Sequence, residues 1–223
     1  MNSRVVKFIA MAAMLVDHIG MVLFPDHIIF RVVGRIAMPL FCFLIAYGVT
    51  KTRNIFKYFL RLFVFAIVVQ LWLNFVISGN LFEFEQLNVF FTLAIGVLTV
   101  GLIKKCRIFA IGLVCVMFVI MTVMIIDVFV PVDYSGAGVL LIVLFYLGLK
   151  HLSLNKAKIA AFFSLAVFNL VLEIVYGYHI QWFSMFEFFV IVFFVDQKLK
   201  ISVYEKWAFY VFYPLHLTIL YLI

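Results

Sequence analysis

Residues 108–130 read IFAIGLVCVMFVIMTVMIIDVFV, and Asp127 is the single charged residue of this stretch. A helix of about 20 apolar residues spans the ~30 Å hydrocarbon core of a bilayer. Stretches of the same kind recur at residues 6–24, 31–50, 58–77, 87–103, 136–150, 157–175, 180–196 and 206–222. The sequence therefore predicts an all-α, polytopic membrane bundle of about nine transmembrane helices, with residues 1–223 forming one domain.

The composition of the whole chain leads to the same class. Of its 223 residues, 68% are hydrophobic and 12% are charged, and the mean hydropathy is +1.27. A soluble domain has about half apolar and about a quarter charged residues. This chain has too few polar side chains to cover a globule in water, and we expect the lipid bilayer to be its solvent.

The charges indicate how the helices are oriented. Lys and Arg collect in the short cytoplasmic loops of membrane proteins, and here all of them except Arg31 and Arg35 fall on one side if the nine segments alternate. The opposite loops carry the acidic residues Asp26, Glu83, Glu85 and Asp133. This asymmetry predicts a cytoplasmic N-terminus. It also explains the net charge of +7 without nucleic-acid binding.

The first segment carries ionisable residues at membrane depth. Lys7 and His18 are eleven residues apart, so they share a helix face about 16 Å apart along the axis. Asp17 points about 100° away from His18. Because Asp17 and His18 interrupt the apolar run, we expect a retained span and not a cleaved signal peptide. Histidine suits proton transfer near neutral pH, which makes His18 a candidate base. The alternative is an interfacial His hydrated by water.

The second segment holds the two exceptions to the charge rule. Arg31 and Arg35 are spaced i,i+4, and Pro39 follows one turn later, where it kinks a helix. Arg keeps its charge at any depth, so each must meet an anion. The pair is a candidate for oxyanion or substrate binding, and the alternative is a structural ion pair with Asp17 or Asp26.

Two further places carry polar side chains within spans. Asn88 and Thr92 are spaced by four, and Tyr213 and His216 lie one helical turn apart in the last span. All four are candidates for substrate or oxyanion binding. Helix packing is the alternative for Thr92, and a buried, hydrogen-bonded imidazole is the alternative for His216.

Several familiar kinds of site are missing from the sequence. Cys42, Cys106 and Cys115 have no CxxC spacing, so we predict packing roles and no metal site. The P-loop, HExxH, GxSxG and dinucleotide-binding patterns are also absent. Two kinds of function remain: group transfer assisted by His, and transport along a path lined by ionisable residues.

The chain resembles the TraX family, which is named for a bacterial membrane protein of conjugative pilus biogenesis. The resemblance lies in MLVDHIG (14–20), GRIAMPLF (34–41), TRNIFKYFLRL (52–62), NVFFTLAIG (88–96), DYSGAGVLL (133–141) and FYPLHL (212–217). These motifs follow in order over almost the whole chain. The resemblance implies a multi-pass protein of the bacterial cytoplasmic membrane. The family is also similar to the multi-spanning membrane acyltransferases.

That likeness implies an enzymatic role. An acyl-CoA, here acetyl-CoA, would act as co-substrate on the cytoplasmic side, and the acceptor would be an extracytoplasmic pilin, peptide or glycan. His18 would be the base, oriented by Asp17, with Arg31 and Arg35 around the oxyanion. Lys7 matches the basic residue that the wider group carries before its His, and it would contact the phosphates of CoA. No metal is required.

Two readings from other functional classes stay open at this point. The same ionisable residues would line the path of a small proton-coupled transporter. A non-enzymatic membrane subunit of a pilus assembly system would need no catalytic His. Labelled acetyl-CoA separates the enzyme from the carrier, since only the enzyme leaves a covalent product.

Overall fold

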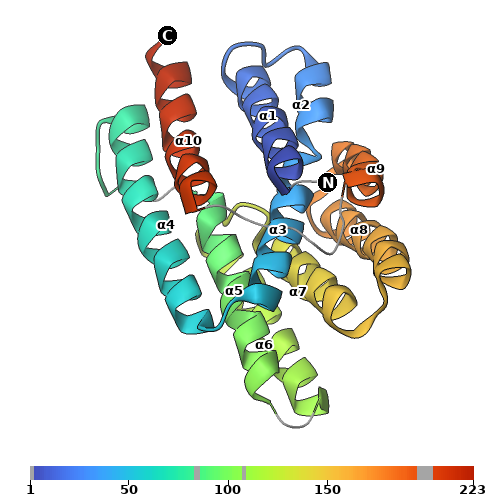
Figure 1. Ribbon diagram of the computed structural model, residues 1–223. Coiled ribbons are helices and arrows are strands. Elements are labelled where there is room, and N and C mark those ends of the chain that lie inside the picture. The colour runs from blue at the N-terminus through green and yellow to red at the C-terminus, as the bar shows by residue number, and fades with distance from the viewer. Residues whose placement is uncertain (1–2, 83–85, 107–108, 195–202) are drawn as a thin grey trace. The chain divides into compact units, whose positions relative to one another are not determined.

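The computed structural model describes residues 3–82, 86–106, 109–194 and 203–223, and Figure 1 shows that these residues are almost entirely helical. The α-helices of this described part are α1 (Ser3–Val22), α2 (Ile28–Gly34), α3 (Ala37–Lys51), α4 (Ile55–Ser78), α5 (Val89–Lys105), α6 (Phe109–Phe129), α7 (Ser135–His151), α8 (Leu154–Tyr176), α9 (Glu187–Phe194) and α10 (Val203–Leu222). A 3-10 helix, η1 (His179–Phe186), precedes α9. The all-α class predicted from the sequence is confirmed.

Five helical segments are long and apolar enough to cross a bilayer. They are Val5–Val22, Ile28–Lys51, Ile55–Ser78, Ile111–Phe129 and Leu154–Tyr176. Shorter apolar helices cover Ser135–His151, His179–Phe193 and Tyr210–Leu222. The chain therefore has the character of a polytopic membrane protein, whereas the number of nine spans and the side of the N-terminus stay predictions.

The second predicted segment, 31–50, is divided into two helices. α2 ends at Gly34 and α3 begins at Ala37, with Arg35 and Ile36 in a turn between them. Pro39 explains the break, because proline has no N–H to donate to the carbonyl four residues earlier, which belongs to Arg35. The kink expected at Pro39 is thus a real interruption of the helix.

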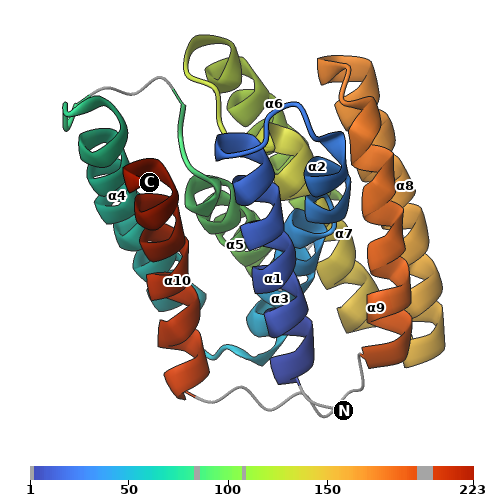
Figure 2. The same cartoon turned by 90° about the horizontal axis from the view of Figure 1, so that it is seen from above.

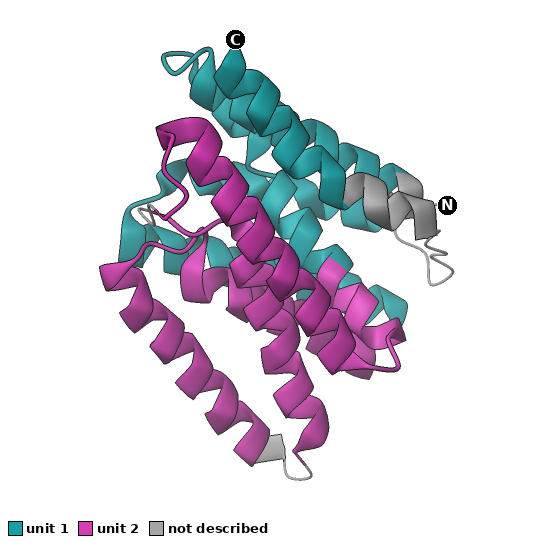
Figure 3. Cartoon of the chain, turned by 90° about the vertical axis from the view of Figure 1, so that its left-hand side faces the viewer, with its two compact units in different colours: residues 1–44, 152–223 teal, residues 45–151 magenta. Residues whose placement is uncertain are grey.

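The described residues divide into two compact units, which Figure 3 colours separately. Unit 1 comprises residues 1–44 and 152–223, and unit 2 comprises residues 45–151. The boundary falls inside α3. The sequence-based assignment of 1–223 to one domain stays a prediction.

Unit 1 brings the two ends of the chain together. α1 packs against α2, α9 and α10, and η1 packs against α2 and α8. Figure 2 shows α8 and α9 running side by side, as their contacts require. The first and last helices of the described residues, which begin at Ser3 and Val203, are therefore neighbours in this unit.

Unit 2 is organised around α5, which contacts α4, α6 and α7. Small residues allow the close approach of α5 and α7. A Cβ at Gly96 would collide with the side chain of Ile142 on α7. Such small-residue contacts replace the hydrophobic driving force that is missing between helices in lipid.

The outward faces of the helices are apolar. On α6, for example, Val114, Phe118 and Phe129 are each largely exposed. A soluble protein rarely exposes contiguous apolar surface of this kind, whereas lipid tails solvate it. The exposed surface therefore agrees with a membrane environment.

A close contact between α1 and α2 gives a first prediction. A Cβ at Gly34 would collide with Cβ and Oδ1 of Asp17. We expect Gly34→Ala to destabilise the protein by about 1–3 kcal/mol, the usual cost of overpacking. Thermal unfolding of the detergent-solubilised variant measures this loss.

Gly112→Ala is the matched control for Gly34→Ala. A Cβ at Gly112 on α6 would lie at an ordinary 3.6 Å from Cβ of Cys106. Since alanine also favours a helix over glycine, this variant should be at least as stable as the unmodified protein. Equal stability of the two variants would contradict the tight α1–α2 contact.

Candidate functional site

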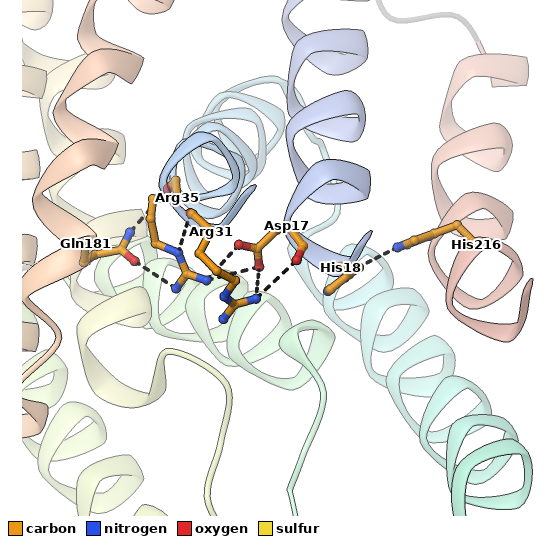
Figure 4. A network of polar contacts seen from close by, with 6 residues as sticks. All are labelled: Asp17, His18, Arg31, Arg35, Gln181 and His216. Carbon is orange, nitrogen blue, oxygen red and sulfur yellow. Dashed lines mark hydrogen bonds and ion pairs between the residues drawn. The ribbon is translucent and has the colours of Figure 1, made fainter. Parts of the chain in front are cut away.

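The candidate site of unit 1 is built on two successive residues of α1. Figure 4 shows Asp17 extending toward Arg31 and Arg35, while His18 extends toward His216 on α10. Consecutive residues of a helix are rotated by about 100°, and this rotation gives each side chain a different neighbouring helix. We call these residues the cluster. Asp17 with the two arginines forms one half and His18 with His216 forms the other, and one turn of α1 holds both halves.

Asp17 binds both guanidinium groups. Nη1 of Arg31 donates to Oδ2 of Asp17 at 2.8 Å, and Nη2 of Arg35 donates to Oδ1 at 2.8 Å and to Oδ2 at 3.2 Å. The side chains of Asp17 and Arg35 are only 13% and 12% exposed, and that of Arg31 is 31% exposed. One carboxylate thus faces two cations, and the cluster keeps a formal charge of +1.

Gln181 on η1 completes the arginine side of the cluster. Its Oε1 accepts from Nη1 of Arg35 at 3.4 Å, and its Nε2 donates to the backbone oxygen of Arg35 at 3.3 Å. That oxygen is the one that Pro39 leaves without its usual helical donor. Backbone carbonyls in a folded protein are nearly always hydrogen-bonded, and Gln181 donates to this one.

This arrangement predicts a coupling between Gln181 and Pro39. We expect Gln181→Leu to destabilise the protein by about 1–3 kcal/mol, because it removes both hydrogen bonds between Gln181 and Arg35. In a Pro39→Ala background residue 39 has an N–H to donate to Arg35, so the same substitution should cost less. A double-mutant cycle of thermal stabilities measures the coupling, and strictly additive effects would contradict it.

The histidine side of the cluster is a direct contact between α1 and α10. Nδ1 of His18 lies 2.6 Å from Nε2 of His216, and Nδ1 of His216 lies 2.6 Å from the backbone oxygen of Phe212. The ring of Tyr213 meets both imidazoles edge-on, with centroids 5.9 Å and 5.8 Å away. His18 is half-buried and His216 is 5% exposed.

The structure thus brings together most of the residues singled out in the sequence. His18, Tyr213 and His216 form one half, and Asp17 with the two arginines forms the other. The ion pair with Asp17 that the sequence offered for Arg31 and Arg35 is present. The contact that orients His18 comes from His216, since Asp17 is held by the arginines.

Gln181 belongs to the cluster although no motif in the sequence singled it out. It lies at the start of the predicted segment 180–196 and is 1% exposed. The sequence held two signals for it. One is a glutamine within an apolar segment, and the other is a proline, which has no N–H to donate to the carbonyl four residues earlier. Neither signal says that the two meet, because they are separated by 142 positions in the sequence.

Lys7 lies on the same helix as His18, three turns earlier. α1 is continuous between them, and Lys7 is half-buried. The separation along the axis is about 16 Å. This places Lys7 well away from the imidazole, and its contact with CoA stays a prediction.

Asn88 and Thr92 belong to unit 2, where protein groups already engage their side chains. Oδ1 of Asn88 accepts from the backbone of Phe90 and caps α5, while its Nδ2 donates to the oxygens of Ala66 and Gln70. The hydroxyl of Thr92 donates to the backbone oxygen of Asp133. These bonds fix α5 within its unit, and a role in substrate binding stays a prediction.

Metal-ligating side chains do not gather anywhere in the described ranges 3–82, 86–106, 109–194 and 203–223, where no three His, Cys, Asp or Glu residues form a group. Cys42, Cys106 and Cys115 are not joined in disulfides, and Cys42 is buried.

The cluster has the parts that acid–base group transfer requires. An imidazole that is held by a second group accepts or returns a proton, and guanidinium groups stabilise negative charge that develops beside it. Both arise from one turn of α1 and the helices packed on it. The arrangement thus places a proton acceptor and positive charge at one turn of α1.

Comparison with curated proteins finds relatives that match only part of this chain. An uncharacterized protein of Rickettsia prowazekii is 30% identical over 90 residues, which cover 40% of this chain and 33% of that protein. The probable fimbrial assembly protein FimC of Dichelobacter nodosus, serogroup H1, is 33% identical over 103 residues, which cover 41% of this chain and 42% of that protein. The matched regions thus span less than half the length of these relatives.

No solved structure matches the chain. The TraX protein family, in contrast, matches residues 2–223, from the helix that carries His18 to the helix that carries His216. The chain belongs to the TraX family.

Proposed function

We propose that this chain is a membrane acyltransferase, which moves an acetyl group from acetyl-CoA to an extracytoplasmic amine or hydroxyl. The observation that carries the proposal is the cluster on α1, in which His18 is bound to His216 while Asp17 next to it binds Arg31 and Arg35. A buried, paired arrangement of this kind is costly in a membrane and typically has a function.

The reaction requires a base and a stabiliser of negative charge. His18 takes the proton of the acceptor as its nitrogen or oxygen attacks the thioester carbonyl. Arg31 and Arg35 lie beside the same turn of α1, and their excess positive charge stabilises the oxyanion. His18 then returns the proton to the sulfur of CoA, which leaves as the thiol.

We also propose the membrane arrangement that this reaction needs. Nine spans, with the N-terminus and most Lys and Arg residues at the cytoplasmic face of a bacterial membrane, follow the positive-inside rule. Lys7 then lies near the cytoplasmic end of α1, where it contacts the phosphates of CoA. His18 lies about 16 Å deeper.

Labelled acetyl-CoA tests the activity. Membranes that contain the protein should transfer the label covalently to a protein, peptide or glycan, and membranes without it should not. Mass spectrometry of surface polymers and secreted peptides should show the matching loss of an acetyl increment when the protein is removed. Label that crosses the membrane without a covalent product would identify a carrier and contradict the proposal.

A second candidate function rests on the similarity to a fimbrial assembly protein. On this reading the chain is a membrane subunit of a pilus assembly system and modifies nothing. Pilin that is assembled normally by a His18→Ala variant, with no acetylated product in either strain, would favour the assembly subunit.

A further inference from the structure

The two imidazoles of the cluster form a hydrogen-bond chain whose proton positions follow from its last acceptor. The chain runs from His18 on α1 to His216 on α10 and ends at the backbone oxygen of Phe212. Figure 4 shows the His18–His216 contact, which joins α1 to α10. Both donor–acceptor distances in this hydrogen-bond chain are 2.6 Å, which is short for bonds that an N–H group donates.

The carbonyl of Phe212 fixes the tautomer of His216. A carbonyl oxygen only accepts, so Nδ1 of His216 must carry the hydrogen of this bond. A neutral imidazole carries one N–H, and its second nitrogen is an acceptor. Nε2 of neutral His216 is therefore the acceptor that faces His18.

The tautomer of His18 follows from that of His216. Nδ1 of His18 donates to Nε2 of His216, so Nε2 of His18 keeps a free lone pair. The contact also limits the charge of the pair, because two imidazolium groups would set two hydrogens against each other across 2.6 Å. At most one of the two rings is charged at a time.

We infer that His216 is a positioning residue that holds His18 in the Nδ1–H tautomer and presents Nε2 of His18 as the base. The inference rests on the proposed acyl transfer for its functional part. The logic is that of a nucleophile–base–orienter system, in which a third group fixes the ring and tautomer of the catalytic His. Here the third group is a second imidazole, where a carboxylate is more common.

The second imidazole also shares the proton of the reaction. When the acceptor attacks the thioester carbon, its proton moves to Nε2 of His18, and the Nδ1 proton of His18 shifts toward Nε2 of His216. His216 then carries the charge and still donates to Phe212. As the carbon–sulfur bond breaks, the shift reverses, and Nε2 of His18 gives its proton to the CoA thiolate. The products are the acetylated acceptor and CoA thiol, so the protein returns to its starting state.

The nearby acid does not perform this task. The carboxylate of Asp17 is bound by Arg31 and Arg35 on another face of α1. The ring of Tyr213 packs against both imidazoles in a T-shaped arrangement, with interplanar angles of 70° and 76°. The hydrogen-bonding partner of His18 is thus supplied by α10.

Nitrogen NMR of histidine side chains tests the tautomers without any assay of activity. Protein labelled with ¹⁵N-histidine in nanodiscs should show His18 and His216 with the hydrogen on Nδ1, which is the minor form of free imidazole side chains. In His216→Leu, the His18 signals should move to the usual Nε2–H form. A wild-type spectrum with the hydrogen of His18 on Nε2 would overturn the inference.

Kinetics test the functional part. We expect His216→Leu to lower kcat at least about 10²-fold, as loss of the orienting group does in related systems, with KM for acetyl-CoA unchanged. His216→Gln should recover part of kcat, because its amide oxygen accepts from Nδ1 of His18. Equal losses in the Leu and Gln variants would overturn the positioning role.

Thr218→Val is the matched control on α10. It removes a hydrogen bond from a side chain to the backbone four residues earlier, as His216→Leu does, but it leaves His18 and His216 in place. This variant should keep both tautomers and most of the transfer activity. A wild-type protein with the expected spectrum that transfers no acetyl group would refute the acyltransferase while the histidine pairing stands.

Discussion

Replacement of His18 by alanine should lower covalent acetyl transfer by about 10²- to 10⁴-fold, the range that a positioned general base contributes. Its imidazole can take a proton and return it, whereas the guanidiniums of Arg31 and Arg35 keep theirs. Transfer is measured with labelled acetyl-CoA and membranes that contain equal amounts of each protein.

The His18→Ala variant should still insert and fold. His18 is half-buried and its ring can be removed without leaving a charge unpaired. His179→Ala is the matched control, since His179 lies on η1 with an exposed ring and pairs with Glu173 away from the cluster. Turnover retained by His18→Ala, with the same protein level, would rule out the base that we assign.

Replacement of Asp17 by alanine should have the largest effect on stability. It removes the one carboxylate that Arg31 and Arg35 share and leaves two mostly buried cations facing each other. Breaking a buried ion pair on one side costs about 3–5 kcal/mol, and partial exposure of Arg31 places this case toward the lower end. Thermal unfolding in nanodiscs, together with the amount of inserted protein, measures the loss.

A charge-matched double variant separates electrostatics from packing. Asp17→Asn with Arg35→Gln restores the net charge of the cluster to that of the unmodified protein, so it should be more stable than Asp17→Asn by itself. Asp26→Asn is the control, because Asp26 is an exposed acid that follows the same helix. If Asp17→Ala proves no less stable than Asp26→Asn, the ion pairs make no net contribution.

Much of the fold could be predicted from residue types and spacing. Apolar runs of membrane length predicted helices, and every predicted segment does contain a helix within the residues that the structure describes. Pro39 predicted a kink, and the helix is interrupted at Arg35 and Ile36, about one turn before it. These features are local, because the backbone in lipid must satisfy its hydrogen bonds within each helix.

The candidate site was predicted only as separate parts. The spacing of Asp17 and His18 predicted that they face different directions, and the i,i+4 spacing of Arg31 and Arg35 predicted that they share a face. Only the structure shows that both bind Asp17. The spacing did not predict which helix His18 faces. For this reason Asp17 was expected to orient His18, whereas α10 supplies the hydrogen-bond partner.

The sequence by itself determined an all-helical membrane protein, its family and the side chains able to do chemistry at membrane depth. Only the tertiary structure decided that the first and last helices meet, that His216 binds His18, and that Gln181 covers the carbonyl freed by Pro39. The reason is physical. Helix formation depends on neighbours a few residues away, whereas apolar helix faces in lipid are nearly interchangeable, so their pairing depends on how small and polar side chains fit together.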